Sequence, residues 1–304
     1  MPERGAIEMA FNLPSANSRL EPAIKSKVPR TSLTPALISA YILIAFGAIF
    51  CLLPFYLMLI YGTHTVQEIF TSPPPFMIGD QFWGNFSRLL ENQPFLRNLW
   101  NSFYIAVLST MITLFFCSLG GFGFAMYEFR GREKLFSLVL GTMLVPGFLG
   151  LVPFYLMMNA FHWLDRPIAL WLPSAANAFG IFLMRQYMGA TIPKDLLEAA
   201  RIDGCNEFGL YWRIGLPLSR PALGTLGLVT FIGGWNNFQG ALIVFQGRET
   251  QTVQVALRAM QGAYTTDWAA LFAGTVVAVV PLLILFAVFS KQLIEGLTAG
   301  SVKG

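Results

Sequence analysis

Six long apolar runs dominate this chain of 304 residues and limit what it can fold into. Polar or charged loops separate the runs, which cover residues 33–60, 99–125, 135–160, 167–184, 222–245 and 268–289. A helix of roughly 20 apolar residues crosses the hydrocarbon core of a bilayer. Hydrophobic residues make up 55% of the chain and charged residues only 12%, which is far less charge than a soluble domain carries. The sequence therefore predicts an all-α, polytopic membrane protein with six transmembrane helices.

The basic residues are divided unevenly between the two sides of these runs. Fifteen of the twenty Lys and Arg residues lie in segment 1–32, in the loops at 126–134 and 185–221, or after residue 290. Since loops rich in Lys and Arg remain on the cytoplasmic side, both termini and the 185–221 loop are predicted to be cytoplasmic. The net charge of +4 is explained by this orientation, so the sequence predicts no nucleic-acid partner.

Side chains that carry catalysis or bind metals are sparse. The cysteines and histidines are isolated from one another: Cys51, Cys117, Cys205, His64 and His162. We interpret the cysteines as packing residues and the histidines as interfacial polar groups. The glycines at 120–123 lack the Lys-Ser/Thr of a phosphate-binding loop and favour close helix packing instead. The sequence thus predicts no catalytic residue, no cofactor and no metal site.

The longest charged stretch between apolar runs covers residues 191–223. Thr191 is expected to cap a short helix of about ten residues. Gly204 is expected to end it, because glycine takes a left-handed conformation without steric cost. One apolar face of this helix would consist of Ile192, Leu196, Leu197 and Ala200.

A second short helix is expected to start at Asn206 and to break at Leu216-Pro217, before Ser219 begins the next apolar helix. A short amphipathic helix held between two membrane helices is suited to binding by another protein. The alternative is a re-entrant loop that only holds its charged groups at the membrane surface.

Polar residues interrupt the fifth apolar run at Trp235, Asn236, Asn237 and Gln239. Side-chain amides are costly in hydrocarbon unless they meet partners or water, so these are expected to face the bundle interior or a pathway. Amides and an aromatic ring suit a neutral, polyhydroxylated solute. The alternative is hydrogen bonding between helices without any contact to a solute.

Two further features concern helix geometry. Pro146 and Pro153 predict kinks in the third run, which serve either packing or gating. The stretch from Tyr264 to Trp268 is expected to cap the sixth helix and anchor it at the outer interface. Glycines after residue 294 oppose a continuing helix there.

The residues Glu198-Ala199-Ala200, then Asp203-Gly204, then Ile214-Gly215-Leu216-Pro217 resemble the EAA loop of ABC importer permeases. In that family the loop forms a coupling helix, which docks in a cleft of a separate ATP-hydrolysing subunit. The resemblance therefore implies a role in ATPase coupling for Leu197, Glu198, Ala199, Ala200, Asp203, Gly204, Leu216 and Pro217.

Residues 95–304 are similar to one subgroup, the maltose-type carbohydrate permeases. The similarity is carried by Asn101-Ser102, Tyr127 to Arg132, Pro146, Pro153, Gln186, Trp235-Asn236, Trp268, Pro281 and the ending from Glu295 to Gly304. It implies a type I ABC importer permease fold with six transmembrane helices. The implied organisation is a cytoplasmic tail at 1–32, a first transmembrane helix at 33–62, an extracytoplasmic segment at 63–94, a permease core at 95–290 and a cytoplasmic tail at 291–304.

The resemblance further implies a set of partners in the bacterial inner membrane and its lipid. These are a second homologous permease subunit, two ATP-binding subunits and an extracytoplasmic solute-binding protein. The chain would not be an enzyme, since ATP hydrolysis occurs on a partner chain. It would form part of the pathway for a neutral sugar or oligosaccharide, with Trp235, Asn236, Asn237 and Gln239 as pathway candidates.

Two alternatives remain open at this point. The first is a permease for glycerol phosphate or a polyol. Glycerol phosphate is an anion and would require a cation deep in the bundle, whereas the six runs contain no Lys or Arg. An ion-driven carrier is the other. It usually requires buried acidic residues, and the six runs contain no Asp or Glu.

Overall fold

A computed structural model describes residues 35–262 and 266–299, with side chains up to Phe289. The chain divides into two compact units, residues 1–53 and 54–304. The described part of the first unit is the beginning of helix α1 (Pro35–Gly62), and most apolar side chains in this part are exposed. The predicted cytoplasmic tail at 1–32 lies outside the described residues.

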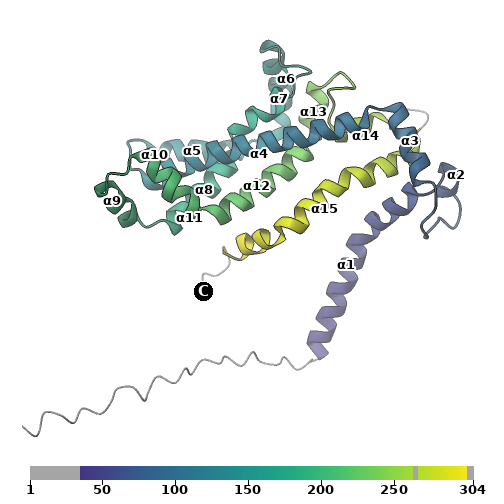
Figure 1. The fold of residues 1–304 in the computed structure, drawn as a ribbon, viewed down its shortest axis with the longest axis horizontal. Helices are drawn as coiled ribbons and strands as arrows, with labels where there is room; N and C mark the ends of the chain where they lie inside the picture. The colour runs from purple at the N-terminus through teal and green to yellow at the C-terminus, as the bar shows by residue number, and fades with distance from the viewer. Residues whose placement is uncertain (1–34, 263–265, 300–304) are drawn as a thin grey trace, which may run out of the picture. The chain divides into compact units, whose positions relative to one another are not determined.

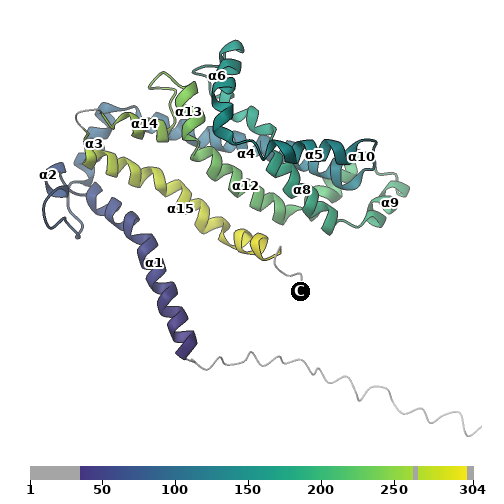
Figure 2. The ribbon, with the colours of Figure 1, turned by 180° about the vertical axis from the view of Figure 1, so that it is seen from behind.

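The second unit contains a bundle built around α4 (Phe95–Met126), and the described residues include no β-strand. Helices α8 (Ala178–Thr191) and α12 (Arg220–Trp235) pack along α4, and α15 (Trp268–Ala299) packs on α12 (Figures 1 and 2). The remaining elements are α2 (Val66–Ile69), α3 (Phe82–Asn92), α5 (Arg132–Thr142), η1 (Gly147–Gly150), α6 (Leu151–Ala160), α7 (Ile168–Trp171), η2 (Pro173–Ala175), α9 (Lys194–Ile202), α10 (Glu207–Leu210), η3 (Tyr211–Gly215), α11 (Leu216–Leu218), α13 (Phe238–Val244) and α14 (Val253–Ala259).

Glycines allow α4 and α8 to approach closely. A Cβ on Gly121 would lie 2.4 Å from the Met184 Cβ and 2.9 Å from the Arg185 backbone nitrogen, so a larger residue would force the helices apart. The packing interpretation of the glycine cluster is confirmed at Gly121. Gly123 contributes nothing to it, because a Cβ there meets no atom within 4 Å.

The prediction of six transmembrane helices is confirmed only in part. Within residues 35–262 and 266–299, four helical stretches are long and apolar enough to cross a membrane, or five if the bent pair Arg132–Thr142 and Gly147–Ala160 forms one span. That pair bends by 91° at residues 143–146, which include Pro146, so the expected kink is a full break. Proline has no backbone N–H to donate, which explains the interruption.

The fifth apolar run is also split. Its first part forms α12 and its second part forms α13, with the break at Asn236-Asn237. Neither piece reaches the length of a span. The sixth run behaves in the opposite way, because α15 continues past residue 289 to Ala299, through the glycine expected to oppose it. Tertiary context overrides a single glycine, whose cost in a helix is only about 1 kcal/mol.

Loops expected on the same side of the membrane do lie together. At one end of the bundle the 127–133 segment contacts α8 and α9 through ion pairs. At the other end Arg88 binds Asp267, with 2.8 Å between Nε and Oδ2. Asp267 also accepts a hydrogen bond from the Ala270 N–H at 3.0 Å, which confirms the predicted cap of the sixth helix.

Candidate functional site

Helix α9, the first helix of the charged loop, begins two residues later than expected. Thr191 is the last residue of α8, and Pro193 precedes the first helical residue, Lys194, so the predicted Thr191 cap is wrong. Pro193 is extended, at φ −65° and ψ 134°, and separates the two helices. The expected end is confirmed, because Gly204 follows α9 with a φ of +84°.

The second short helix starts as predicted. The Asn206 side chain caps α10 by accepting a hydrogen bond from the Gly209 N–H at 2.7 Å. The helical path does not break at Leu216-Pro217, however; it passes through the wide turn η3 and ends at Leu218. Pro217 is the second residue of α11, directly after the wide turn η3. Ser219 then precedes α12, with its hydroxyl buried.

Only one stripe of α9 is packed against the bundle. Leu197 is 2% exposed and belongs to a core cluster with Met184, Met188 and Leu210, against which Ala200 and Leu216 pack. Leu196, expected on the same apolar face, is 43% exposed. Neighbouring helical residues differ by 100° in direction, so packing on Leu197 turns Leu196 away.

The remaining residues proposed for coupling form a free surface at the end of the bundle. Glu198, Ala199, Asp203, Gly204 and Pro217 are all exposed. In Figure 1 α9 lies at the extremity of the second unit, beyond α10 and α8. Leu197, Ala200 and Leu216 therefore hold the loop in place, and the exposed residues are free to contact another molecule.

Three exposed apolar side chains on this surface were missed by the sequence reasoning. Ile202 is 86% exposed, Phe208 64% and Trp212 54%. Phe208 and Trp212 stack with their ring centroids 6.1 Å apart, beside a hollow of about 350 Å³ next to Gly204. The signal was present at Ile202, which follows Leu197 by five residues and so lies on the opposite side of the helix.

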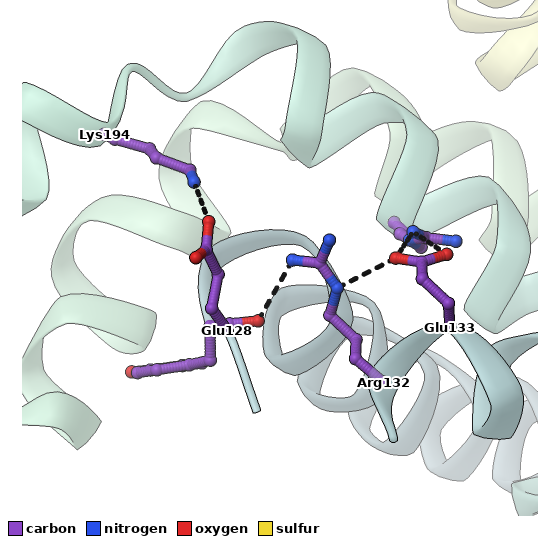
Figure 3. A network of polar contacts seen from close by, with 6 residues as sticks. Glu128, Arg132, Glu133 and Lys194 are labelled. Carbon is purple, nitrogen blue, oxygen red and sulfur yellow. Dashed lines mark hydrogen bonds and ion pairs between the residues drawn. The ribbon is translucent and has the colours of Figure 1, made fainter. Parts of the chain in front are cut away.

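Charged side chains connect this surface to the segment after α4. Lys194 Nζ lies 2.8 Å from Glu128 Oε1, and Arg132 Nε lies 2.9 Å from Glu133 Oε1 (Figure 3). Arg185 also binds Glu133, at 2.9 Å. Hydrogen bonds from Arg185 and Arg132 lower the pKa of Glu133, and the Lys194 ammonium lowers that of Glu128. These carboxylates are therefore ionised at neutral pH.

Glu207 at the start of α10 has two partners. Its carboxylate accepts hydrogen bonds from Arg201 Nε at 2.9 Å and Arg201 Nη2 at 3.2 Å, and from the Tyr127 hydroxyl. Arg201 and Tyr127 lower the pKa of Glu207. Partial burial and the bond to Glu207 raise the pKa of Tyr127 to about 12, so the phenol keeps its proton and donates.

The pathway candidates lie at the break between α12 and α13. The Asn237 side chain caps α13 by accepting from the Gly240 N–H at 3.1 Å. Trp235 is only 1% exposed and stacks on Phe231. Asn236 and Gln239 are exposed in the single chain, and Asn236 Oδ1 lies 3.4 Å from Gln254 Nε2. The structure thus uses Asn237 locally and leaves Asn236 and Gln239 accessible.

The opposite end of the bundle contains a connecting loop, residues 246–252, held by the half-buried Asp165 and by two buried asparagines, Asn98 and Asn101, of which only Asn101 stood out in the sequence. Asp165 Oδ1 accepts hydrogen bonds from the Gln246 N–H at 2.7 Å, the Gly247 N–H at 2.9 Å and the Thr250 hydroxyl at 2.7 Å. Partial burial disfavours the Asp165 carboxylate, but these three donors outweigh it and hold its pKa below the ordinary value.

Two asparagines of α4 complete the attachment of this loop. Asn98 Nδ2 donates to the carbonyls of Arg248 at 2.7 Å and Gln251 at 3.0 Å. Asn101 Nδ2 donates to those of Glu249 at 2.8 Å and Gln251 at 3.0 Å. Both asparagines are almost fully buried.

A bundle of apolar helices that presents a short amphipathic helix at one end defines a membrane protein with an exposed helical loop. Residues 118–297 match the family described as the binding-protein-dependent transport system inner membrane component. The chain belongs to this family. It is therefore an integral inner-membrane transport component rather than an enzyme.

Individual relatives support this assignment over most of the chain. The arabinooligosaccharides transport system permease protein AraQ of Bacillus subtilis is 38% identical over 204 residues, 67% of this chain and 72% of the relative. The lactose transport system permease protein LacG of Rhizobium radiobacter is 31% identical over 263 residues, 86% of this chain and 95% of LacG.

A solved structure shares the fold. One chain of a bacterial ABC transporter involved in the import of the acidic polysaccharide alginate superposes with a TM-score of 0.75. The two sequences are 24% identical, and the match covers 84% of this chain and 95% of the other. The helical arrangement is thus that of an ABC importer permease.

Proposed function

We propose that this chain and a second homologous permease form the translocation pathway for a neutral sugar or oligosaccharide. Two separate ATP-binding subunits drive transport through the loop at 191–217, and an extracytoplasmic solute-binding protein delivers the solute. Both termini and the 191–217 loop are cytoplasmic in this proposal. The six apolar runs then correspond to six crossings, of which the third and the fifth are broken helices.

The coupling role is supported by the surface of α9. Glu198, Ala199, Asp203 and Gly204 are exposed together, while Leu197 fixes the helix to the core from the other side. The surface also presents Ile202, at 86% exposed, outside the apolar spans. Such apolar exposure next to charged residues is typical of a protein interaction site.

The proposed solute class is supported by the relatives and by the chemistry of the candidate pathway. AraQ and LacG are named for arabinooligosaccharides and lactose, whereas the solved structure belongs to an importer of an acidic polysaccharide. The apolar runs of this chain contain no Lys or Arg to attract an anion. Asn236, Asn237 and Gln239 offer neutral donors and acceptors instead.

Replacing Gly204 by leucine tests the docking role. A leucine there adds bulk at the centre of the exposed surface, so we expect uptake per ATP hydrolysed to fall about tenfold, the equivalent of about 1.4 kcal/mol of lost contact. Gly131→Leu is the matched control, because Gly131 also has a positive φ, +89°, and open space around its Cα. The measurement is uptake and hydrolysis in proteoliposomes containing both permeases and the ATPase, with the solute-binding protein outside. Wild-type coupling in Gly204→Leu, or equal loss in both variants, contradicts the proposal.

The same proteoliposomes test the solute class. Labelled neutral pentose and hexose oligosaccharides and a labelled uronic-acid oligosaccharide are supplied in parallel. We expect ATP-dependent uptake of a neutral compound and none of the uronic one. Preferred uptake of the anionic compound overturns the neutral assignment and leaves the coupling test unaffected.

A further inference from the structure

The segment directly after α4 is attached to both ends of the α9 region. Glu128 binds Lys194, the first residue of α9, and Tyr127 binds Glu207, the first residue of α10 (Figure 3 shows the Glu128 contact). Arg201, near the end of α9, binds the same Glu207 carboxylate with two nitrogens. Two neighbouring residues therefore hold the beginning and the end of the α9 segment.

Tyr127 connects this polar cluster to the core. Its ring packs edge-on against Phe122 of α4, with the centroids 5.8 Å apart, and Phe122 contacts Tyr211 at 5.6 Å. Tyr127 packs against the same buried cluster as Leu197 and Met184. Its hydroxyl points away from that cluster to Glu207. The side chain is thus fixed at one end by apolar packing and at the other by a charged acceptor.

The backbone changes direction on each side of α9, and on the C-terminal side one hydrogen bond spans the turn, from the Cys205 N–H to the Ala200 carbonyl at 2.9 Å. Pro193 is extended on one side, and on the other Gly204 takes a left-handed conformation in the turn leading to Asn206. If no side chains held α9, a force on the helix would rotate it about the backbone at these two residues, Pro193 and Gly204. The contacts of Tyr127 and Glu128 bridge both of these positions.

We propose that Tyr127 is a positioning residue that makes α9 and the end of α4 move as one unit, with the Glu128–Lys194 pair as a second contact. This inference rests on the proposed coupling function. Helix α4 packs against α8 and α12, so a displacement passed to α4 reaches the helices that surround the candidate pathway. A displacement absorbed at Pro193 and Gly204 would not.

Exposed ion pairs contribute little to stability, so removing these contacts is expected to leave the fold intact. Tyr127→Phe removes only the hydroxyl and keeps the packing on Phe122. Tyr187→Phe is the matched control: Tyr187 packs against the same cluster from α8, and its hydroxyl has no hydrogen-bond partner among the described residues. Tyr127→Phe combined with Lys194→Ala removes both contacts. The paired reversal Glu128→Lys with Lys194→Glu restores the second contact with opposite charges.

The test uses the full complex in proteoliposomes, with spin labels on exposed Arg130 and Asp195 and distances measured with and without ATP and Mg²⁺. In the unsubstituted complex and in Tyr187→Phe, we expect the distance between the two labels to be the same with and without ATP and Mg²⁺. In Tyr127→Phe with Lys194→Ala we expect a nucleotide-dependent shift, together with a decrease in uptake per ATP of about threefold to tenfold, the range expected from the loss of one typical hydrogen bond. The charge reversal should restore the second contact. Its spin-label distance and its uptake per ATP should both be close to those of the unsubstituted complex.

An unchanged distance and unchanged uptake per ATP in the double variant overturn the proposal. If Gly204→Leu still uncouples transport in that case, the docking role stands and only the link fails. If Gly204→Leu has no effect either, the proposed coupling function fails as well. A lowered melting temperature in Tyr127→Phe but not in Tyr187→Phe, without a distance change, shows a purely structural role and also contradicts the link.

Discussion

Loop 246–252 and helix α9 are both connecting segments at the ends of the bundle, but they are held by different kinds of contact. The loop is fixed by Asn98 and Asn101, which are buried, and by Asp165, which is half-buried; all three bond to backbone groups of the loop. Around α9 the polar contacts are exposed; the side chains of Lys194 and Glu128 are 58% and 76% accessible. Beneath them, Leu197 alone of the α9 residues is buried.

The two kinds of contact differ in how much free energy is needed to displace each segment. Breaking a bond of buried Asn98 or Asn101 leaves an unsatisfied group, so moving the backbone of residues 248–251 away from α4 is costly. Exposed ion pairs exchange with water at little cost and are screened by salt. The α9 contacts are therefore separable: we expect single substitutions to remove each of them without loss of the fold. This suits a segment that is moved by a partner, and the loop at the other end suits a fixed surface.

The largest expected effect is at Asn98. Asn98→Ala leaves the carbonyl of Arg248 without its donor and opens a cavity beside α4, so we expect the free energy of unfolding to fall by about 2–3 kcal/mol. Thermal unfolding of the purified protein measures it. The control is Asn92→Ala, since Asn92 is exposed and bonds only within its own helix. If the two variants unfold at the same temperature, the loop is not held as described.

A smaller, pH-dependent effect is expected at Asp165. Its pKa in the folded state is lower than its ordinary value of 3.8, so its stabilising contribution is complete above pH 3.8 and decreases as the pH falls through the lower folded-state value. Thermal unfolding between pH 7 and pH 3 should show this decrease in the unsubstituted protein.

Asp165→Asn supplies the comparison. The variant should be less stable at neutral pH and should lack that part of the acid dependence, while Asp80→Asn, at an exposed carboxylate, should follow the unsubstituted protein. An identical pH curve for Asp165→Asn and the unsubstituted protein contradicts the proposed role.

The smallest effect is expected at Lys194. Lys194→Ala removes the exposed pair with Glu128, so we expect a melting temperature indistinguishable from that of the unsubstituted protein at 0.5 M salt, with at most a slight decrease at 0.02 M. Differential scanning fluorimetry at both salt concentrations measures it. A decrease as large as that of Asn98→Ala would remove the contrast between the two ends.

Local backbone chemistry was predictable from single residues. Gly204 in a left-handed conformation, Asn206 as a helix cap and Asp267 as the cap of α15 all follow from what those side chains do within a few residues of their own position. The close packing at Gly121 was predictable for the same reason, since a missing side chain permits close approach in any helix pair. Apolar runs likewise identified a membrane protein, because bilayer thickness fixes the length of a span.

Where helices break and which faces are covered depended on contacts between distant residues. The sequence by itself did not show that Asn237 would cap a new helix, that Leu197 and not Leu196 would be buried, or that α15 would continue to Ala299. The pairing of Tyr127 with Glu207 joins residues 80 positions apart. Helix boundaries and buried faces of this kind are determined by the packing of whole helices against one another, which outweighs the small helix propensities of individual residues.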